Sequence, residues 1–165
     1  MAGLGSEAPA EGRLAEAIMG EAVVAEARAW IGTPYLHQAS CRGAGSDCLG
    51  LVRGIWRVLH GAEPCPVPPY TADWAEVARH EALLEAARHW LVPKAQDDAA
   101  PGDVLVFRMR PGGMAKHLGV QSACGVGGGG RFIHAYSGHH VTESALTAPW
   151  TRRIAARFRF PLKGE

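Results

Sequence analysis

The chain has 165 residues, of which 47% are hydrophobic and 20% are charged, and its formal net charge is +1. This composition is typical of a globular domain with a substantial core, and it excludes a disordered chain. The near-neutral charge gives no argument for binding nucleic acid or an anionic membrane surface. No apolar run approaches the roughly 20 residues that a membrane span requires.

The N-terminal residues 1–11 are small and polar, which predicts a flexible arm before a single domain over residues 12–165. The arm has neither a basic segment nor an apolar one, so we predict no secretory signal peptide and synthesis in the cytoplasm. Apolar residues recur at helical spacing from Glu11 to Ile31. They predict a helix that ends at the Gly-Thr-Pro-Tyr segment, residues 32–35.

A second helix is predicted to begin near Ser46 or Asp47, which are both common N-cap residues, and to end at Gly61. The residues before it, 36–45, are predicted to form a loop. The helix is followed by a proline-rich connector, residues 64–70, which is too short to separate two domains.

A third helix is predicted from the capping-box spacing of Asp73 and Glu76 to about Leu91, before Pro93. Beyond Pro101 the pattern changes to short apolar or alternating runs, which predict strands. These strands are expected at residues 104–109, 117–123, 131–136, 139–144 and 153–160. Helices first and strands second indicate an α+β fold, in which N-terminal helices pack on an antiparallel β-sheet.

The last predicted strand alternates apolar and basic residues. Its core face is expected to carry Ile154, Ala156, Phe158 and Phe160, and its other face to carry Arg153, Arg157 and Arg159. One interpretation of the arginines is a solvated outer face that also discourages unwanted strand pairing. The other is a docking stripe for an acidic patch on a partner protein, since arginine pairs well with carboxylates.

The segment Gly125 to Gly130 has the spacing of the GxGxxG phosphate-binding motif. The residues that follow, RFIHAY, predict a strand, whereas a dinucleotide site requires a helix at this point. We therefore interpret the glycines as a hairpin loop.

The four cysteines form no CxxC pair, which argues against a zinc site, and we expect them to be free thiols. Cys48 differs from the other three because a capped helix would place it in the first helical turn. There, the helix dipole and the free N–H groups favour thiolate and can stabilise an oxyanion. The alternative is a structural core cysteine at a helix start.

A thiolate nucleophile requires a general base, and the base requires a side chain that orients it. His117 is at the head of one predicted strand and His134 lies in the next, so a hairpin would bring them side by side. His139 and His140 fall in a predicted turn and are expected to face solvent. The order Cys, His, His on helix, strand, strand is therefore a candidate nucleophilic site.

These segments resemble, in the same order, the NlpC/P60 family of cysteine peptidases, which share a papain-like core. The resemblance rests on AxxWIGTPY (27–35), DCLGLV (47–52), PGDVLVF (101–107), HLGV (117–120) and FIHA (132–135). Four further segments are similar to the subgroup found in phage tails and gene transfer agents: HQAS (37–40), GLVRGIWR (50–57), PPYTADW (68–74) and FRFP (158–161).

The resemblance implies that Cys48 is the nucleophile, His117 the general base and His134 the residue that orients the base. It also implies that Tyr35 lines the site and helps to polarise the scissile carbonyl. Asp47 matches the acidic residue before the nucleophile and is expected to cap the helix.

The family cleaves the peptide stems of peptidoglycan, typically at the γ-D-glutamyl–diaminopimelate bond. The resemblance therefore implies a cell-wall endopeptidase that needs no metal or other cofactor. The subgroup implies an enzyme on a phage-like tail or gene transfer agent particle, bound to a tail-hub or baseplate protein, which acts in the periplasm of the target cell during DNA entry. Two alternatives are a structural tail-tip component with weak or lost hydrolysis, and an acyl-transfer or amide-hydrolysing enzyme with a non-wall substrate.

Overall fold

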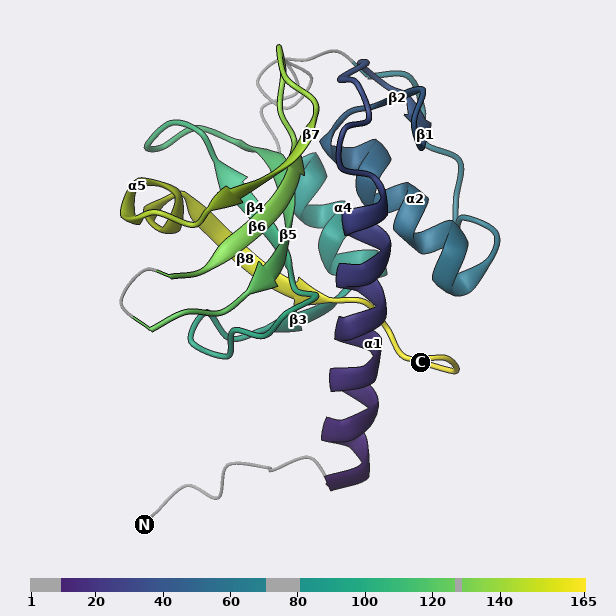
Figure 1. Cartoon of the computed structure of the whole chain (residues 1–165), viewed down its shortest axis with the longest axis vertical. Coiled ribbons are helices and arrows are strands. Elements are labelled where there is room, and N and C mark those ends of the chain that lie inside the picture. Colours follow the sequence, from purple (N-terminus) through teal and green to yellow (C-terminus); the bar gives the residue numbers. More distant parts are fainter. Residues whose placement is uncertain (1–9, 71–80, 127–128) are drawn as a thin grey trace.

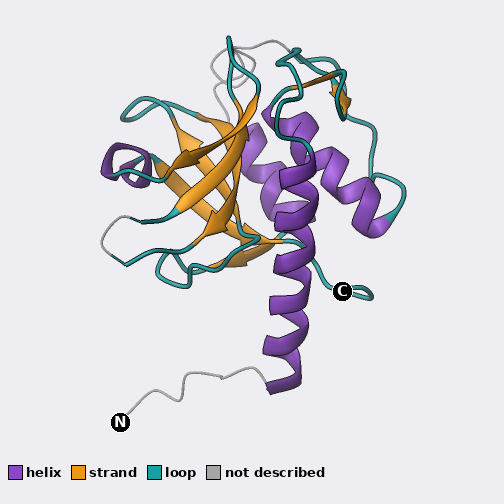
Figure 2. Ribbon diagram, viewed as in Figure 1, coloured by secondary structure: helices purple, strands orange, loops and turns teal. Residues whose placement is uncertain are grey.

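The protein is described by a computed structural model that covers residues 10–70, 81–126 and 129–165. The three longer helices lie against one face of a six-stranded sheet, whose strand order is β3-β8-β4-β5-β6-β7 (Figures 1 and 2). Every neighbouring pair in this sheet is antiparallel. The predicted α+β class, with helices packed on an antiparallel sheet, is confirmed.

The first two helices lie close to their predicted positions. Helix α1 spans Ala10–Ala29, but its buried residues, Val23, Val24 and Ala27, all lie in the second half. Figure 1 shows the first half of α1 extending beyond the sheet. Helix α2 spans Cys48–His60 and is followed by Gly61, which has the positive φ of 86° that favours glycine at a helix end. None of the helices in the described residues combines the length and apolarity needed to cross a bilayer.

The third helix differs from the prediction. Helix α4 spans Ala82–Trp90, and Glu81 before it has a non-helical backbone, so a helix that runs through this point to Leu91 is wrong. The Glu81 carboxylate instead accepts hydrogen bonds from Arg108 and, at 3.0 Å, from the backbone N–H of Ala115. These bonds hold Glu81 against the turn between two strands. The predicted capping box at 73–76 lies outside the described residues.

Five strands lie where the sequence predicts them: β4 (Val104–Arg108), β5 (Ala115–Ala123), β6 (Arg131–Ala135), β7 (Val141–Ala145) and β8 (Ile154–Arg159). The prediction missed four short elements: β1 (Ser40–Cys41), β2 (Gly45–Ser46), β3 (Val92–Lys94) and α5 (Ala148–Arg152). Strands β1 and β2 pair with each other inside the predicted loop. Strand β3 contains Pro93 and pairs with β8 at the edge of the sheet, where a proline is tolerated.

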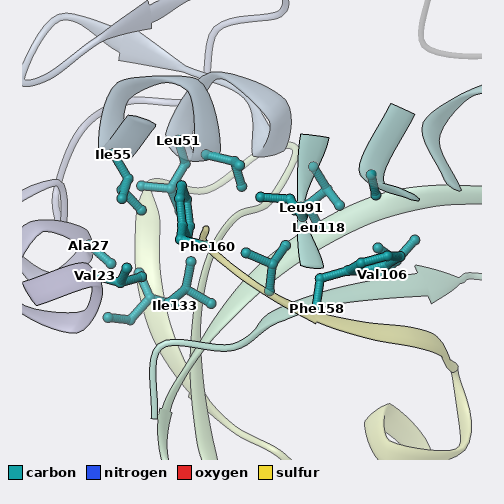
Figure 3. Packing of buried hydrophobic residues seen from close by; sticks show 14 of the residues in the cluster. Val23, Ala27, Leu51, Ile55, Leu91, Val106, Leu118, Ile133, Phe158 and Phe160 are labelled. Carbon is teal, nitrogen blue, oxygen red and sulfur yellow. The ribbon is translucent and has the colours of Figure 1, made fainter. Parts of the chain in front are cut away.

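Apolar residues pack on both faces of the sheet. The larger cluster lies between the sheet and the helices, and Figure 3 shows Leu51 and Ile55 of α2 facing Phe160 and Ile133. The smaller cluster, on the other face, contains Leu105, Phe107, Phe132 and Leu146, with Trp150 of α5 packed against it. Full burial of one such side chain contributes about 1.5–3 kcal/mol. The sheet is therefore fixed from both sides.

The face assignment of the last strand is wrong at its start. Between β4 and β8 the register shifts, so that Ala156 pairs with Val106 but Ile154 pairs with Phe107. This bulge turns Ile154 toward the smaller apolar cluster, whereas Phe158 packs in the larger one. A register shift places one extra residue in a strand and reverses the alternation beyond it.

The predicted arginine face is also wrong, because it is not an open basic stripe. Arg157 is 5% exposed and donates a hydrogen bond to Asp103 at 2.8 Å. Arg159 forms ion pairs with Glu16 at 3.2 Å and Glu165 at 2.7 Å. Arg153 lies over the ring of Trp150, 5.4 Å from its centroid. These arginines therefore stabilise the fold, and the docking interpretation loses its basis.

Candidate active site

A pocket of about 210 Å³ lies where the first turn of α2 meets one end of the sheet. At this end β4 finishes, β5 begins and β6 finishes, because neighbouring strands are antiparallel. Three of the four predicted site residues line this Cys48 pocket, and its lining is Tyr35, His37, Cys48, Leu49, Tyr70, Leu83, Met109, Lys116, His117, Ala135, Tyr136 and Ser137. The fourth, His134, does not line the pocket but contacts His117 on the side away from it.

Cys48 is the first residue of α2, as the sequence predicts. Asp47 is the N-cap, and its Oδ1 accepts a hydrogen bond from the backbone N–H of Gly50 at 2.7 Å. Gly50 itself is required by a close approach, since a Cβ there would lie 1.9 Å from the carbonyl oxygen of Ala39. The loop before the helix can therefore pack directly on the first turn of α2. Cys48, in the same turn, is half-buried and lines the pocket.

The protonation state of Cys48 differs from the expectation. Burial raises the pKa of the Cys48 thiol to about 12, and the Asp47 carboxylate adds to the increase. The backbone N–H group of Leu118 in β5 opposes it, as do those of Leu49 and Cys48 at the helix start, but their effect is smaller. At neutral pH the Cys48 side chain is therefore a thiol.

The two histidines form a hydrogen-bonded pair. His117 Nε2 lies 2.9 Å from His134 Nδ1, on neighbouring strands β5 and β6. Burial, followed by the neighbouring His134, lowers the pKa of His117 to about 3. Burial, followed by His139, lowers the pKa of His134 to about 4. Both rings are therefore neutral at neutral pH, and His117 keeps an unprotonated nitrogen that can act as a base.

Tyr35 belongs to a segment that lies between the start of β7 and the loop before α2. Its backbone N–H donates to the carbonyl of His139 at 3.2 Å, and it also forms a bridge with Ser46. Burial raises the pKa of the Tyr35 hydroxyl, and the charges of Cys48 and Asp47 raise it further. The hydroxyl therefore stays protonated and can donate a hydrogen bond into the pocket.

Comparison with known proteins identifies the family of this chain. The sequence model of the NlpC/P60 family matches residues 32–159. The chain belongs to the NlpC/P60 family. The gamma-DL-glutamyl hydrolase of Bacillus subtilis is 30% identical over 141 residues, which cover 84% of this chain but 29% of that protein. This NlpC/P60 chain thus spans less than a third of the length of that relative.

Solved structures give the same fold. The NlpC/p60 domain of the peptidoglycan hydrolase SagA is similar with a TM-score of 0.53 and 27% identity, over 87% of this chain and 98% of that one. An NlpC/P60 family protein from Bacillus cereus is similar with a TM-score of 0.57 and 20% identity, over 86% of this chain and 40% of that one.

Aromatic rings enclose the histidine pair of this NlpC/P60 chain, and the sequence did not reveal this enclosure. The ring of Trp150, from α5, lies 5.9 Å from His117 and 5.3 Å from His134. Phe132 lies 4.3 Å from His134, and Phe107 lies 5.7 Å from His117. Rings packed this closely exclude water, which explains why burial dominates both histidine pKa values. The one local signal was Phe132, which is two residues before His134 and hence on the same face of β6.

A second tyrosine at the pocket was also missed. The hydroxyl of Tyr70, in the proline-rich connector, donates to Asp47 Oδ2. The backbone carbonyl of Tyr70 accepts a hydrogen bond from Gln38 and lies 2.8 Å from His37 Nε2. Tyr70 therefore fixes the connector against the loop before α2, so that both segments form one wall of the pocket.

His139, His140 and the three other cysteines do not line the Cys48 pocket. His139 and His140 are exposed, as predicted, and all four cysteines are free thiols. Across the described ranges of the chain, no three His, Cys, Asp or Glu side chains are grouped in a way that could hold a metal ion.

Proposed function

We propose that this chain is a cysteine endopeptidase that hydrolyses amide bonds in peptidoglycan stem peptides, at the D-glutamyl–diaminopimelate bond. The observation that carries the proposal is the meeting, at one pocket, of Cys48 at a capped helix start with the hydrogen-bonded pair of His117 and His134. The names of two relatives, a gamma-DL-glutamyl hydrolase and a peptidoglycan hydrolase, agree with this substrate class.

The geometry supports acyl transfer through a thioester. His117 takes the proton of the Cys48 thiol as Sγ attacks the amide carbonyl. Backbone N–H groups at the start of α2 and the Tyr35 hydroxyl stabilise the oxyanion. The protonated His117 then gives its proton to the leaving amine, which leaves the acyl group on the sulfur. His117 next takes a proton from water, which attacks the thioester and regenerates the thiol.

A cationic side chain also lies beside the proposed base. The register of β5 against β4 passes from His117 opposite Phe107 to Ala115 opposite Arg108, so Lys116 is a bulge residue. As a result, the successive residues Lys116 and His117 both line the pocket. Among the described residues that line it, Lys116 alone carries a permanent charge. A lysine beside the base suits a substrate with a carboxylate near the scissile amide, and D-glutamyl–diaminopimelate peptides have one.

The place of action is a further part of the proposal: a phage-like tail or gene transfer agent particle, held by a tail-hub or baseplate protein, and acting in the periplasm of the target cell. Its support is the sequence resemblance to that subgroup. Two of the subgroup segments meet in space, because Tyr70 of PPYTADW contacts His37 and Gln38 of HQAS beside the nucleophile. These two subgroup segments therefore contribute to the same wall of the Cys48 pocket.

The deciding experiment is incubation of the full chain with purified peptidoglycan, followed by mass analysis of the released fragments. We expect fragments with a new D-glutamate carboxyl end and a new diaminopimelate amino end. Cys48→Ala is the control and should release none while its thermal unfolding is unchanged. A folded wild-type protein that releases no fragment would favour the structural tail-tip role, and cleavage of other amides alone would favour a non-wall substrate.

A further inference from the structure

The histidine pair continues to a third polar group. Ser144 Oγ lies 3.0 Å from His134 Nε2, so that β5, β6 and β7 each contribute one member of a hydrogen-bonded row. Ser144 pairs with Phe132 across the strands, and Phe132 is on the same face as His134. Ser144 therefore reaches His134 diagonally, and it lies on the far side of His134 from His117.

Only one arrangement of protons lets His117 act as a base. Its Nε2 is engaged by His134, so Nδ1 is the ring nitrogen that can take the thiol proton. A neutral imidazole with an unprotonated Nδ1 carries its proton on Nε2, and this N–H must donate to His134 Nδ1. When His117 becomes cationic, Nε2 still donates to the same acceptor. His134 Nδ1 must therefore stay unprotonated in both states.

This requirement fixes the remaining proton. A neutral His134 with an unprotonated Nδ1 carries its proton on Nε2, which points to Ser144 Oγ. His134 is 2% exposed and is flanked by the rings of Phe132 and Trp150, so solvent contributes little to the choice of tautomer. The acceptor that stabilises the Nε2–H form is then the serine hydroxyl.

We propose that Ser144 is a positioning residue, which accepts a hydrogen bond from the Nε2–H group of His134 and thereby helps to keep His117 in the tautomer that acts as a base. The inference rests on the proposed function, because it takes His117 as the base for Cys48. The row works in one direction when His117 is the base: His117 Nε2 donates to His134, and His134 Nε2 donates to Ser144, without which this buried N–H would have no acceptor in the row.

The test compares three substitutions at Ser144. Ser144→Ala removes the acceptor, Ser144→Cys keeps nearly the same volume but replaces it with a weak acceptor, and Ser144→Thr retains a hydroxyl. Thr142→Val is the matched control, because Thr142 is on the same strand and face, directly opposite His134. Nitrogen NMR of the imidazole rings reports which nitrogen carries the proton, and steady-state cleavage of a stem peptide gives kcat and KM.

In the wild type we expect His134 to carry its proton on Nε2. In the alanine and cysteine variants we expect a mixture of tautomers and a kcat about 3–10-fold lower at unchanged KM, which corresponds to the loss of one hydrogen bond. The threonine variant and the Thr142→Val control should behave as the wild type does. A wild-type His134 protonated on Nδ1, or a Ser144→Ala protein with unaltered tautomer and kcat, would overturn the inference.

The NMR measurement needs no substrate, so the two proposals can fail separately. A wild type that shows the expected Ser144-dependent tautomer but cleaves no peptidoglycan would refute the proposed function and leave the tautomer assignment intact. A wild type that cleaves peptidoglycan, with a tautomer independent of Ser144, would refute the inference alone.

Discussion

Two buried polar clusters lie at opposite ends of strand β5. In one, buried charges are paired, whereas in the other the buried side chains are neutral. Near the C-terminal end of β5, Arg157 donates to both Asp103 and Gln121, and Lys94 donates to Asp103 at 2.9 Å. Opposite charges are in contact in this Asp103 ion cluster. At the start of β5, no charged group among the described residues is in hydrogen-bond contact with the pair of His117 and His134, and burial keeps both rings neutral.

The difference shows that burial of polar groups does not by itself mark a reactive site. In the ion cluster each charge is held by a counter-charge, so moving a proton would leave an uncompensated ion. In the histidine pair no counter-charge holds a proton, so a nitrogen lone pair stays available. The pair also reaches the pocket through His117, whereas Arg157 does not line it. Neutrality and access together make the histidine end suited to catalysis.

The largest effect is expected from His117→Gln. Removal of a general acid–base group lowers the rate by about 10²–10⁴-fold, and the free energy of unfolding should not fall, because a buried imidazole is replaced by an amide. The measurement is the rate of stem-peptide release, with urea unfolding as the check on folding.

His134→Gln is the matched variant for this prediction. The glutamine can accept a hydrogen bond from His117 and donate one to Ser144, so measurable activity should remain. Wild-type activity in the His117→Gln protein would show that the base lies elsewhere.

The ion cluster is expected to respond in the opposite way, through stability. Arg157→Met leaves Asp103 without one of its cationic partners and should lower the free energy of unfolding by about 3–5 kcal/mol, as is typical when one member of a buried pair is removed. The variant protein that remains folded should cleave at the wild-type rate. Urea unfolding measures the loss, and the exposed Arg152→Met should change it by less than about 0.5 kcal/mol.

A stability loss in Arg152→Met as large as that in Arg157→Met would contradict the structural role of the ion cluster. A fall in the cleavage rate of folded Arg157→Met would contradict the separation of the two ends of β5.

Acid should lower the free energy of unfolding through the histidine pair at the start of β5. The folded pKa values of His117 and His134 are about 3 and about 4, below the 6.5 of an unperturbed histidine. The unfolded chain therefore binds more protons below pH 6.5, and stability is lost as the pH falls from there toward the folded pKa values. Each histidine should cost about 1.4 kcal/mol per pH unit in this window.

Urea unfolding at pH 7 and pH 5 measures this loss. The double variant His117→Gln, His134→Gln should reduce it, whereas changing the exposed His140 to Gln should not. An acid loss equal in all three proteins would show that other groups dominate.

The sequence predicted the parts of the site that depend on neighbouring residues. The helix start at Cys48 could be found because Asp47 and Gly50 lie within one turn of it. The two histidines could be found because each lies in a strand with a clear apolar pattern, and a hairpin joins the strands. Local signals of this kind are enough for the α+β class, for the first two helices and for the five longer strands.

The rest depended on pairings between residues that are distant in the chain. Ser144 and Trp150 reach the histidines through the pairing of β6 with β7 and the position of α5, a five-residue helix with no buried residue. The faces of β8 were assigned wrongly because the bulge at its start is set by β4. The thiol pKa was expected to fall because a sequence shows the helix dipole but not how deeply the sulfur is buried.

The smallest effect is expected from Asp47→Asn, which tests a group that combines features of both ends of β5. Asp47 is a buried carboxylate like Asp103, and the backbone N–H groups of Gly50 and Gln38 each donate to it at 2.7 Å. Unlike Asp103, it acts on the proposed nucleophile, because its charge raises the pKa of the Cys48 thiol.

Asparagine keeps an oxygen that can cap Gly50 but removes the charge, so the pKa of the Cys48 thiol should fall. Alkylation of Cys48 by iodoacetamide at neutral pH should then be about 2–5-fold faster, since only the thiolate reacts and one pKa unit changes its population tenfold. Peptide mass spectrometry gives the rate, and the exposed Cys41 and Cys124 serve as internal standards. An unchanged rate at Cys48 would show that the Asp47 charge does not control the thiol, and the Asp47 side chain would then act through the hydrogen bonds that it accepts from Gly50, Gln38 and Tyr70.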